Sequence, residues 1–266
     1  MSSITEFAGT VPQNYDRYLG PLFFEPYALD LVERLKSRHY ERILELASGT
    51  GRVTRHLVEL LSKKGQLYAT DLNPDMLEDA KHRLESKAIT WQVVDAHEIP
   101  FDADFFEAVV CQFGVMFFKD KPKAFTEVYR VLQPGGTFLF NTWDHYRHNT
   151  ASYLTQQVMN EVFPDNPPDF MEKGPYSFFD TGRIRQLLEE AGFTNVQIDT
   201  VSKVGVLTSA EDVANGFVDG SPLTGYLIER QASREDIKKK ITEAVRTQYP
   251  HLQLPMQAMV CTARKA

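Results

Sequence analysis

The feature that most constrains the fold of this chain is an alternation of short apolar runs with helical patterns between residues 42 and 142. Strand patterns occupy residues 42–47, 66–70, 90–94, 105–111 and 137–142. Helical patterns occupy residues 22–36, 53–61, 74–86 and 122–132. Strands that alternate with helices of about ten residues predict βαβ units and a parallel sheet. Because the strands are apolar throughout, helices are expected on both faces of that sheet.

The alternation stops after Asp144, and the rest of the chain is predicted to add elements to this α/β core. Helices are predicted at residues 149–163, 181–191, 210–217, 222–230 and 233–248. Strands are predicted at residues 196–204 and 256–262, and a proline-rich loop at residues 164–175.

Charge and cysteine content exclude several classes of protein. Lys and Arg total 29 against 36 Asp and Glu, and the net charge of −7 disfavours binding to nucleic-acid phosphates. Cys111 and Cys261 lack metal-ligand spacing, so we expect reduced thiols in a cytoplasmic protein. The 7 His residues are scattered, and no metal site is predicted.

The longest nearly apolar run, residues 108–118, is too short to span a membrane, and the N-terminus has no signal-peptide pattern. The oligomeric state is left open.

A turn of small residues, Ala47-Ser48-Gly49-Thr50-Gly51, lies between the first strand and the next helix. Small side chains let a ligand approach the backbone closely, and doubly wound sheets bind ligands at this edge. The N–H groups at the start of the helix suit an anionic group. On its own, the turn is also explained as a purely structural one.

Acidic residues follow three successive strands at this edge. Glu45 ends the first strand, Asp71 ends the second and Asp95 follows the third. A carboxylate at Asp71 suits a ribose diol, and one at Asp95 suits an adenine amine. Asp71 is alternatively an N-cap or turn residue before Asn73-Pro74, and Asp95 is alternatively a turn residue. Taken together, the three carboxylates predict a cleft for a ribose, an adenine and a cationic tail.

The sequence resembles a known family, the class I S-adenosylmethionine-dependent methyltransferases. The resemblance is strongest to the small-molecule branch of the ubiquinone/menaquinone-biosynthesis type. The matching segments are ERILELASGTGRVT, LYATDLNPDML, WQVVDAHEIPF, FEAVVCQFGVMFF and EVYRVLQPGGTFLF. The resemblance implies a Rossmann-like, mostly parallel seven-stranded sheet with an antiparallel last strand, helices on both faces and helical cap insertions. It implies one domain over residues 1–266, with lid helices at 1–38, a cofactor-binding core at 39–143, and cap insertions at 144–180 and 205–250.

The resemblance also implies S-adenosyl-L-methionine as cofactor and assigns its contacts. Glu45 is expected near the methionine ammonium, and Gln112 near the methionine end. Asp71 is expected to hold the ribose hydroxyls. The remaining expected cofactor contacts are Ala47 (where the family has Gly), Gly49, Gly51, Leu72, Asp95, Ala96 and the lid residues Tyr15 and Tyr18. Alternatively, the two tyrosines pack the first helix onto the sheet.

For a methyltransferase, the expected reaction is in-line displacement, in which the protein aligns the acceptor and excludes water. His145 and His148 are the candidate general bases, with a surface-loop role as the alternative for each. The chain is rich in aromatic residues outside the core motifs, which favours a small, apolar or aromatic acceptor. The candidate acceptor contacts are Phe117, Tyr146, Phe178 and Phe217.

Two other functions are compatible with parts of this pattern. A protein that binds the cofactor without turnover shares every cofactor motif. An NAD-dependent dehydrogenase shares the glycine turn and Asp71, but its fingerprint needs a third glycine where this chain has Thr54.

Overall fold

The computed structural model describes residues 14–266, apart from the side chain of Tyr15. A seven-stranded sheet has the strand order β3-β2-β1-β4-β5-β7-β6. The first four neighbouring pairs are parallel, and β7 is antiparallel to β5. The strands are β1 (Tyr40–Glu45), β2 (Leu61–Asp71), β3 (Ile89–Val93), β4 (Phe106–Gln112), β5 (Leu132–Trp143), β6 (Thr194–Val206) and β7 (Gln253–Arg264). The topology confirms the predicted Rossmann-like α/β class with its antiparallel last strand.

The helices follow the predicted segments closely, with one correction. They are η1 (Tyr15–Phe24), α2 (Glu25–Leu35), α3 (Thr54–Leu57), η2 (Val58–Leu60), α4 (Pro74–Arg83), η3 (Val115–Phe117), α5 (Lys121–Val131), η4 (Tyr146–His148), α6 (Thr150–Val162), α7 (Phe170–Lys173), α8 (Thr181–Glu190), α9 (Ala210–Asp219), α10 (Leu223–Glu229) and α11 (Arg234–Gln248). The prediction of a loop at 164–175 was wrong in part, because α7 forms there and buries Met171.

The described chain divides into two compact units. Residues 27–143, 178–201 and 258–266 form the sheet unit, and residues 14–26, 144–177 and 202–257 form the helical unit. Strands β6 and β7 contribute residues to both units. The expected single domain with cap insertions stays a prediction, although the helical unit contains most of the predicted insertions.

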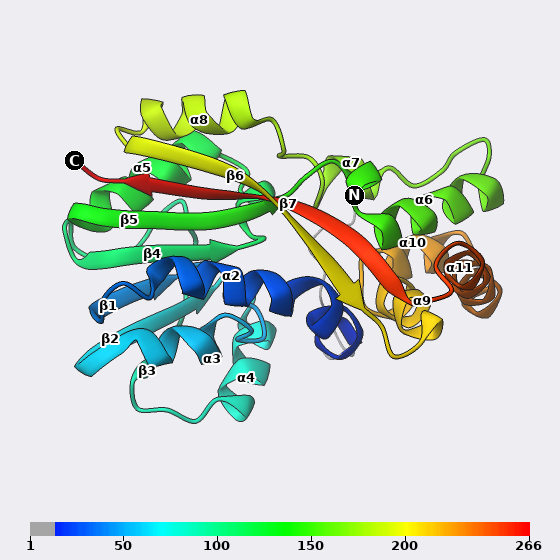
Figure 1. Cartoon of the computed structure of the whole chain (residues 1–266), viewed down its shortest axis with the longest axis horizontal. Helices are drawn as coiled ribbons and strands as arrows, with labels where there is room; N and C mark the ends of the chain where they lie inside the picture. Colours follow the sequence, from blue (N-terminus) through cyan, green and yellow to red (C-terminus); the bar gives the residue numbers. More distant parts are fainter. Residues whose placement is uncertain (1–13) are drawn as a thin grey trace. The chain divides into compact units, whose positions relative to one another are not determined.

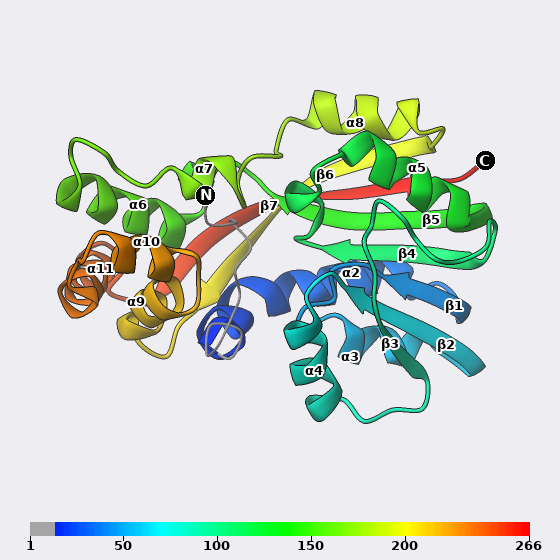
Figure 2. The same ribbon diagram turned by 180° about the vertical axis from the view of Figure 1, so that it is seen from behind.

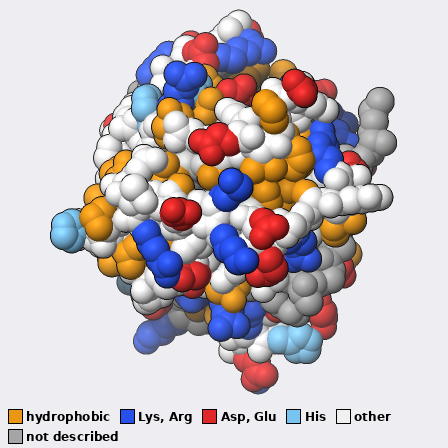
Figure 3. Space-filling model, turned by 90° about the vertical axis from the view of Figure 1, so that its right-hand side faces the viewer, with side chains coloured by type: hydrophobic (Ala, Val, Ile, Leu, Met, Phe, Trp, Pro, Cys, Tyr) orange, Lys and Arg blue, Asp and Glu red, His pale blue; other side chains and the backbone are white. Residues whose placement is uncertain are grey.

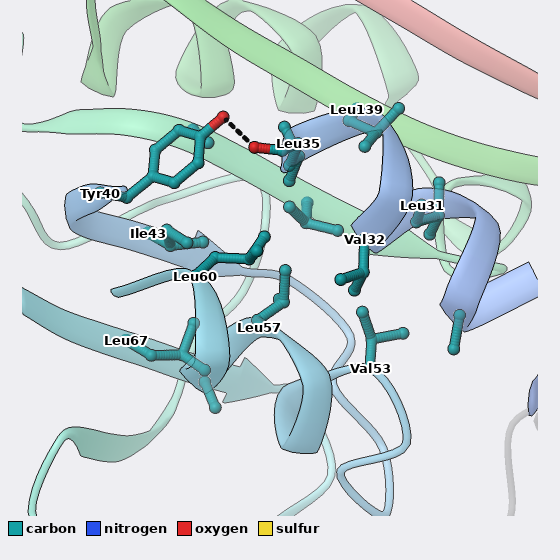
Figure 4. Packing of buried hydrophobic residues seen from close by; sticks show 14 of the residues in the cluster. Leu31, Val32, Leu35, Tyr40, Ile43, Val53, Leu57, Leu60, Leu67 and Leu139 are labelled. Carbon is teal, nitrogen blue, oxygen red and sulfur yellow. Dashed lines mark hydrogen bonds between the residues drawn. The ribbon is translucent and has the colours of Figure 1, made fainter. Parts of the chain in front are cut away.

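Helices cover both faces of the sheet unit (Figures 1 and 2). On one face, α2 and α3 pack on β1, β2 and β4 through an apolar cluster that includes Leu31, Ile43 and Leu57. Figure 4 shows this cluster, in which the Tyr40 hydroxyl donates a hydrogen bond to the Leu35 carbonyl. On the opposite face, Phe125 of α5 packs against β5. The largely apolar central strands therefore have the two covered faces that their composition predicts.

The helical unit is built around α6, α9 and α11. Helix α11 buries its apolar stripe of Ile237, Ile241 and Val245, and Ser233 caps it by accepting a hydrogen bond from the N–H of Asp236. On the face of the molecule shown in Figure 3, Lys and Arg side chains are interspersed with Asp and Glu.

Candidate active site

The turn after β1 is fixed at the carboxyl edge of the sheet by its neighbouring strands. The N–H of Leu46 donates to the carbonyl of Val110 on β4, and the N–H of Ser48 donates to the carbonyl of Thr70 on β2. Gly49 and Gly51 have φ angles of +55° and +81°. These left-handed conformations explain glycine at both positions, because residues with a Cβ rarely adopt them.

The two glycines differ in what surrounds them. A Cβ at Gly49 would meet no atom within 4 Å, so the backbone there borders open space. A Cβ at Gly51 would lie 2.7 Å from Leu84 Cδ1 and 3.4 Å from Trp91. Gly49 therefore has the room for a ligand that the sequence predicts. Gly51 is required by packing within the sheet unit, and its contact with a cofactor stays a prediction.

Ala47 stands where the family has glycine, and its φ angle of +52° is left-handed. This conformation costs an alanine roughly 1–2 kcal/mol relative to the right-handed one. Its neighbour in space is Gly114, where an added Cβ would lie 2.6 Å from Ala47 Cβ and 2.7 Å from Cys111 Sγ. The turn after β1 and the turn after β4 are therefore packed against each other.

We expect Gly114→Ala to lower the free energy of unfolding by about 1–3 kcal/mol, the usual cost of overpacking. Urea unfolding of Gly114→Ala, Ala47→Gly and the double variant measures this. In the Ala47→Gly background the substitution at Gly114 should cost less, because one of the two clashing atoms is gone. An equal cost in both backgrounds would contradict the packing described.

Glu45 is buried at the end of β1, where only 1% of its surface is exposed. Burial raises the pKa of its carboxyl to about 8, and the nearby Asp71 carboxylate adds to this, while a hydrogen bond from Thr54 opposes it. That bond runs from Thr54 Oγ1 to Glu45 Oε2 over 2.6 Å. In its ionised form, which a nearby positive charge favours, this buried carboxyl is a suitable partner for a cationic group.

Asp71, at the end of β2, connects the glycine turn to the loop that follows β2. Its Oδ2 accepts from the N–H of Gly49 at 2.8 Å, and its Oδ1 accepts from the N–H of Asn73 at 2.9 Å. Burial raises the pKa of the Asp71 carboxyl, and these backbone donors oppose the rise. Of the two alternative roles predicted for Asp71, the helix cap is wrong, because the Asn73 side chain itself caps α4. The turn role is present, because Oδ1 accepts from the N–H two residues further along the chain.

Asp95 is half exposed and shapes the loop after β3. Its Oδ1 accepts from the N–H of His97 and from His97 Nδ1, and both contacts lower the pKa of Asp95. His97 Nε2 accepts from the N–H of Asp120 at 3.1 Å, so the ring carries its proton on Nδ1. The turn role proposed for Asp95 as an alternative is thus present. Its expected contact with adenine stays a prediction, as do those of the buried Ala96 and the exposed Leu72.

At the end of β4, the half-buried Gln112 precedes an aromatic cluster that the sequence did not predict. The rings of Phe113 and Trp143 stack with centroids 3.8 Å apart, and Tyr27 packs edge-on against both at 5.4 Å. The Tyr27 hydroxyl donates to the Val201 carbonyl. Apolar patterns placed each residue in a buried element, but nothing in the sequence indicated that α2, β4 and β5 meet there.

The candidate bases lie in the helical unit. His148 Nδ1 is 2.7 Å from Asp144 Oδ2, a contact in which the ring donates because a carboxylate only accepts. His145 Nδ1 accepts from the N–H of Arg147. Asp144 also accepts from the N–H of His145 and is 6% exposed, so it holds the start of η4 as well as the His148 ring.

The other predicted residues divide between the units. Tyr146 and Phe217 are buried in the helical unit, where Phe217 packs edge-on against Phe23. Tyr18, also in that unit, lies beside Gly216 of α9, and its alternative role of packing the first helix onto the sheet stays a prediction. In the sheet unit, Phe117 is 38% exposed and Phe178 is buried, with its ring 5.0 Å from Lys121 Nζ. The Tyr15 side chain lies outside the described part of the chain.

The chain matches a family model described as a methyltransferase domain over residues 44–140. It is 27% identical over 197 residues to the mitochondrial 2-methoxy-6-polyprenyl-1,4-benzoquinol methylase of Drosophila melanogaster, a match that covers 64% of this chain and 65% of that protein. It is also 27% identical over 181 residues to the ubiquinone/menaquinone biosynthesis C-methyltransferase UbiE of Proteus mirabilis, covering 62% and 71%. The chain thus spans just under two thirds of the fly protein's length.

Among solved structures, the chain resembles Haemonchus contortus phosphoethanolamine N-methyltransferase 2, solved with phosphomonomethylethanolamine and S-adenosylhomocysteine. The TM-score is 0.65 at 19% identity, covering 98% of this chain and 59% of that one. This likeness concerns the fold, and the match to the family model lies within the sheet unit. The chain thus contains a methyltransferase domain over residues 44–140, and the curated relatives that it resembles are methyltransferases.

Proposed function

We propose that this chain transfers the methyl group of S-adenosylmethionine to a small, apolar or aromatic acceptor by in-line displacement. One observation carries the proposal. The buried Glu45 carboxyl lies close enough to the Asp71 carboxylate to feel its charge, and Asp71 bonds directly to the N–H of Gly49, whose backbone borders open space. This arrangement lies at the carboxyl edge of β1 and β2, where open α/β sheets bind ligands.

The residues present fit this cofactor. Glu45 supplies a buried partner for the ammonium of the methionine tail, and Asp71 supplies acceptors for the ribose hydroxyls. A Cβ would fill the space at Gly49, so glycine leaves room for the ligand. The Ser48 hydroxyl is buried and has no hydrogen-bond partner among residues 14–266. Leu72, 66% exposed, offers an apolar surface for a base.

The cofactor supplies an already activated methyl group. The work left to the chain is to orient the acceptor and to exclude water, and orientation can supply about 7–11 kcal/mol of the barrier. An acceptor that must lose a proton needs a base, and His148 is the better candidate because Asp144 fixes its ring orientation. His145 stays the second candidate.

Two features support an apolar or aromatic acceptor. The predicted acceptor residues Phe117, Tyr146, Phe178 and Phe217 are all aromatic, and the fly relative is named for a benzoquinol substrate. We also propose a cytoplasmic location. Cys111 and Cys261 support it, because both are buried free thiols that form no disulfide. None of the helices in residues 14–266 has the length and apolar character needed to cross a bilayer. In the same residues, no group of three or more His, Cys, Asp and Glu side chains is arranged to hold a metal ion.

Turnover tests the proposal. The full chain is incubated with S-adenosylmethionine and a panel of phenols, hydroquinones and aromatic amines, and S-adenosylhomocysteine is quantified. We expect product with at least one aromatic acceptor and none without acceptor. Tight binding of S-adenosylmethionine with no product on any acceptor class would favour the alternative, a binding protein without turnover.

A further inference from the structure

Asn141 is the third residue from the end of β5, and only the oxygen of its buried side-chain amide has a hydrogen-bond partner. The side chain is 0% exposed. Its Oδ1 accepts from the N–H of Phe113 at 2.8 Å. Its Nδ2 has no hydrogen-bond acceptor among residues 14–266. A buried donor without an acceptor costs about 1–3 kcal/mol, so its presence at this edge needs an explanation.

The strand alternation places Asn141 on the same face as the candidate cofactor residues. Side chains two positions apart share a face, and the apolar cluster under α2 contains Ile43, Leu67, Val110 and Leu139. Glu45 of β1, Asp71 of β2, Gln112 of β4 and Asn141 of β5 continue those rows toward the carboxyl edge. Asn141 is also directly opposite Gln112 in the β4–β5 register.

Spacing and chemistry indicate what this donor binds. Strands β1 and β5 are separated by β4, so Glu45 and Asn141 rise from strands about 9–10 Å apart, twice the usual spacing. This separation matches the span of an amino-acid head group together with one hydrogen bond of about 2.9 Å at each of its two ends. Such a head group needs an acceptor for its ammonium and a donor for its carboxylate. Glu45 is the acceptor, and Asn141 has the free donor.

We propose that the Asn141 amide donates a hydrogen bond to the carboxylate of the methionine tail of the bound cofactor. The proposal rests on the function proposed above. It assigns the two ends of the tail to two strands: the ammonium to Glu45 of β1 and the carboxylate to Asn141 of β5. Through Oδ1, the same side chain fixes Phe113, whose φ angle of +50° is left-handed.

Calorimetric titration of the full chain with S-adenosylhomocysteine and with methylthioadenosine, which lacks the amino-acid tail, tests this assignment. Asn141→Asp keeps an acceptor for the Phe113 N–H and opposes the ligand carboxylate, whereas Asn141→Leu loses both functions. Thr142→Val is the matched control, because Thr142 lies on the opposite face of β5 and bonds to the Phe178 carbonyl.

We expect both Asn141 variants to bind S-adenosylhomocysteine at least about tenfold more weakly, the equivalent of one lost charged hydrogen bond. Their affinity for methylthioadenosine should stay within twofold of the wild type, and Thr142→Val should change neither. The proposal is overturned if Asn141→Asp, with an unchanged melting temperature, binds both ligands normally. The proposal is also overturned if the affinities for both ligands fall by the same factor, because Asn141 then acts only through Phe113. Failure of the wild-type chain to bind either ligand would instead contradict the proposed function itself.

Discussion

Asp71→Ala is expected to weaken the binding of S-adenosylhomocysteine at least about tenfold, and up to about a hundredfold if both ribose hydroxyls bond to the carboxylate. Asp71 has two functions at once. It supplies acceptors for a ribose, and it holds the N–H groups of Gly49 and Asn73 in place. Removing the carboxylate therefore removes a ligand contact and releases the turn that borders the ligand.

Calorimetry separates this effect from a general loss of negative charge. Asp75→Ala removes an exposed carboxylate four residues along the chain and should leave the affinity unchanged. Methylthioadenosine retains the ribose. Asp71→Ala should therefore weaken the binding of methylthioadenosine as much as the binding of S-adenosylhomocysteine. Unchanged affinity for both ligands in a folded Asp71→Ala variant would remove Asp71 from the site.

Binding of S-adenosylhomocysteine is expected to strengthen by up to about a hundredfold between pH 6 and pH 9, because the ammonium needs the ionised form of Glu45. Burial raises the pKa of Glu45 to about 8, so the carboxyl is mostly protonated at pH 6. Below the pKa, each pH unit costs about tenfold in affinity. Glu45→Gln should bind weakly at every pH in this range and should lose the dependence.

Stability should show the opposite dependence on pH. The folded chain holds the Glu45 proton with a pKa of about 8, whereas the free carboxyl has an ordinary pKa of 4.5. The contribution of this group to stability is therefore fully present below about pH 4.5 and is lost as the pH rises toward 8. Urea unfolding of wild type and Glu45→Gln at pH 5 and pH 8 measures the difference. A wild-type chain whose binding and stability change with pH no more than those of Glu45→Gln would contradict this account of Glu45.

The sheet and the carboxylates at its edge could be predicted from the sequence because both depend on local patterns. Apolar runs separated by helical segments define β1 to β5, and the position of Glu45 and Asp71 at strand ends follows directly. Parallel strands end at one edge, so these residues meet without any further information. The glycine at position 49 could be predicted for the same reason, since a tight turn there requires a left-handed backbone.

Other features depend on contacts between distant segments and left no local pattern. The stack of Phe113 on Trp143 joins β4 to β5, and the contact of Ala47 with Gly114 joins two turns that are 67 positions apart. The half-satisfied amide of Asn141 is invisible in a sequence, because an asparagine in an apolar strand gives no hint of which of its atoms has a partner. The short helix α7 was missed because prolines dominate the segment that contains it.

We expect the edge formed by Glu45, Gly49 and Asp71 to bind an S-adenosyl ligand. Isothermal titration of the full chain with S-adenosylhomocysteine and with NAD⁺ at pH 8.5 tests it most directly. We expect one saturable site for S-adenosylhomocysteine and no binding of NAD⁺ at the same concentrations. Binding of NAD⁺ without any binding of S-adenosylhomocysteine would contradict it.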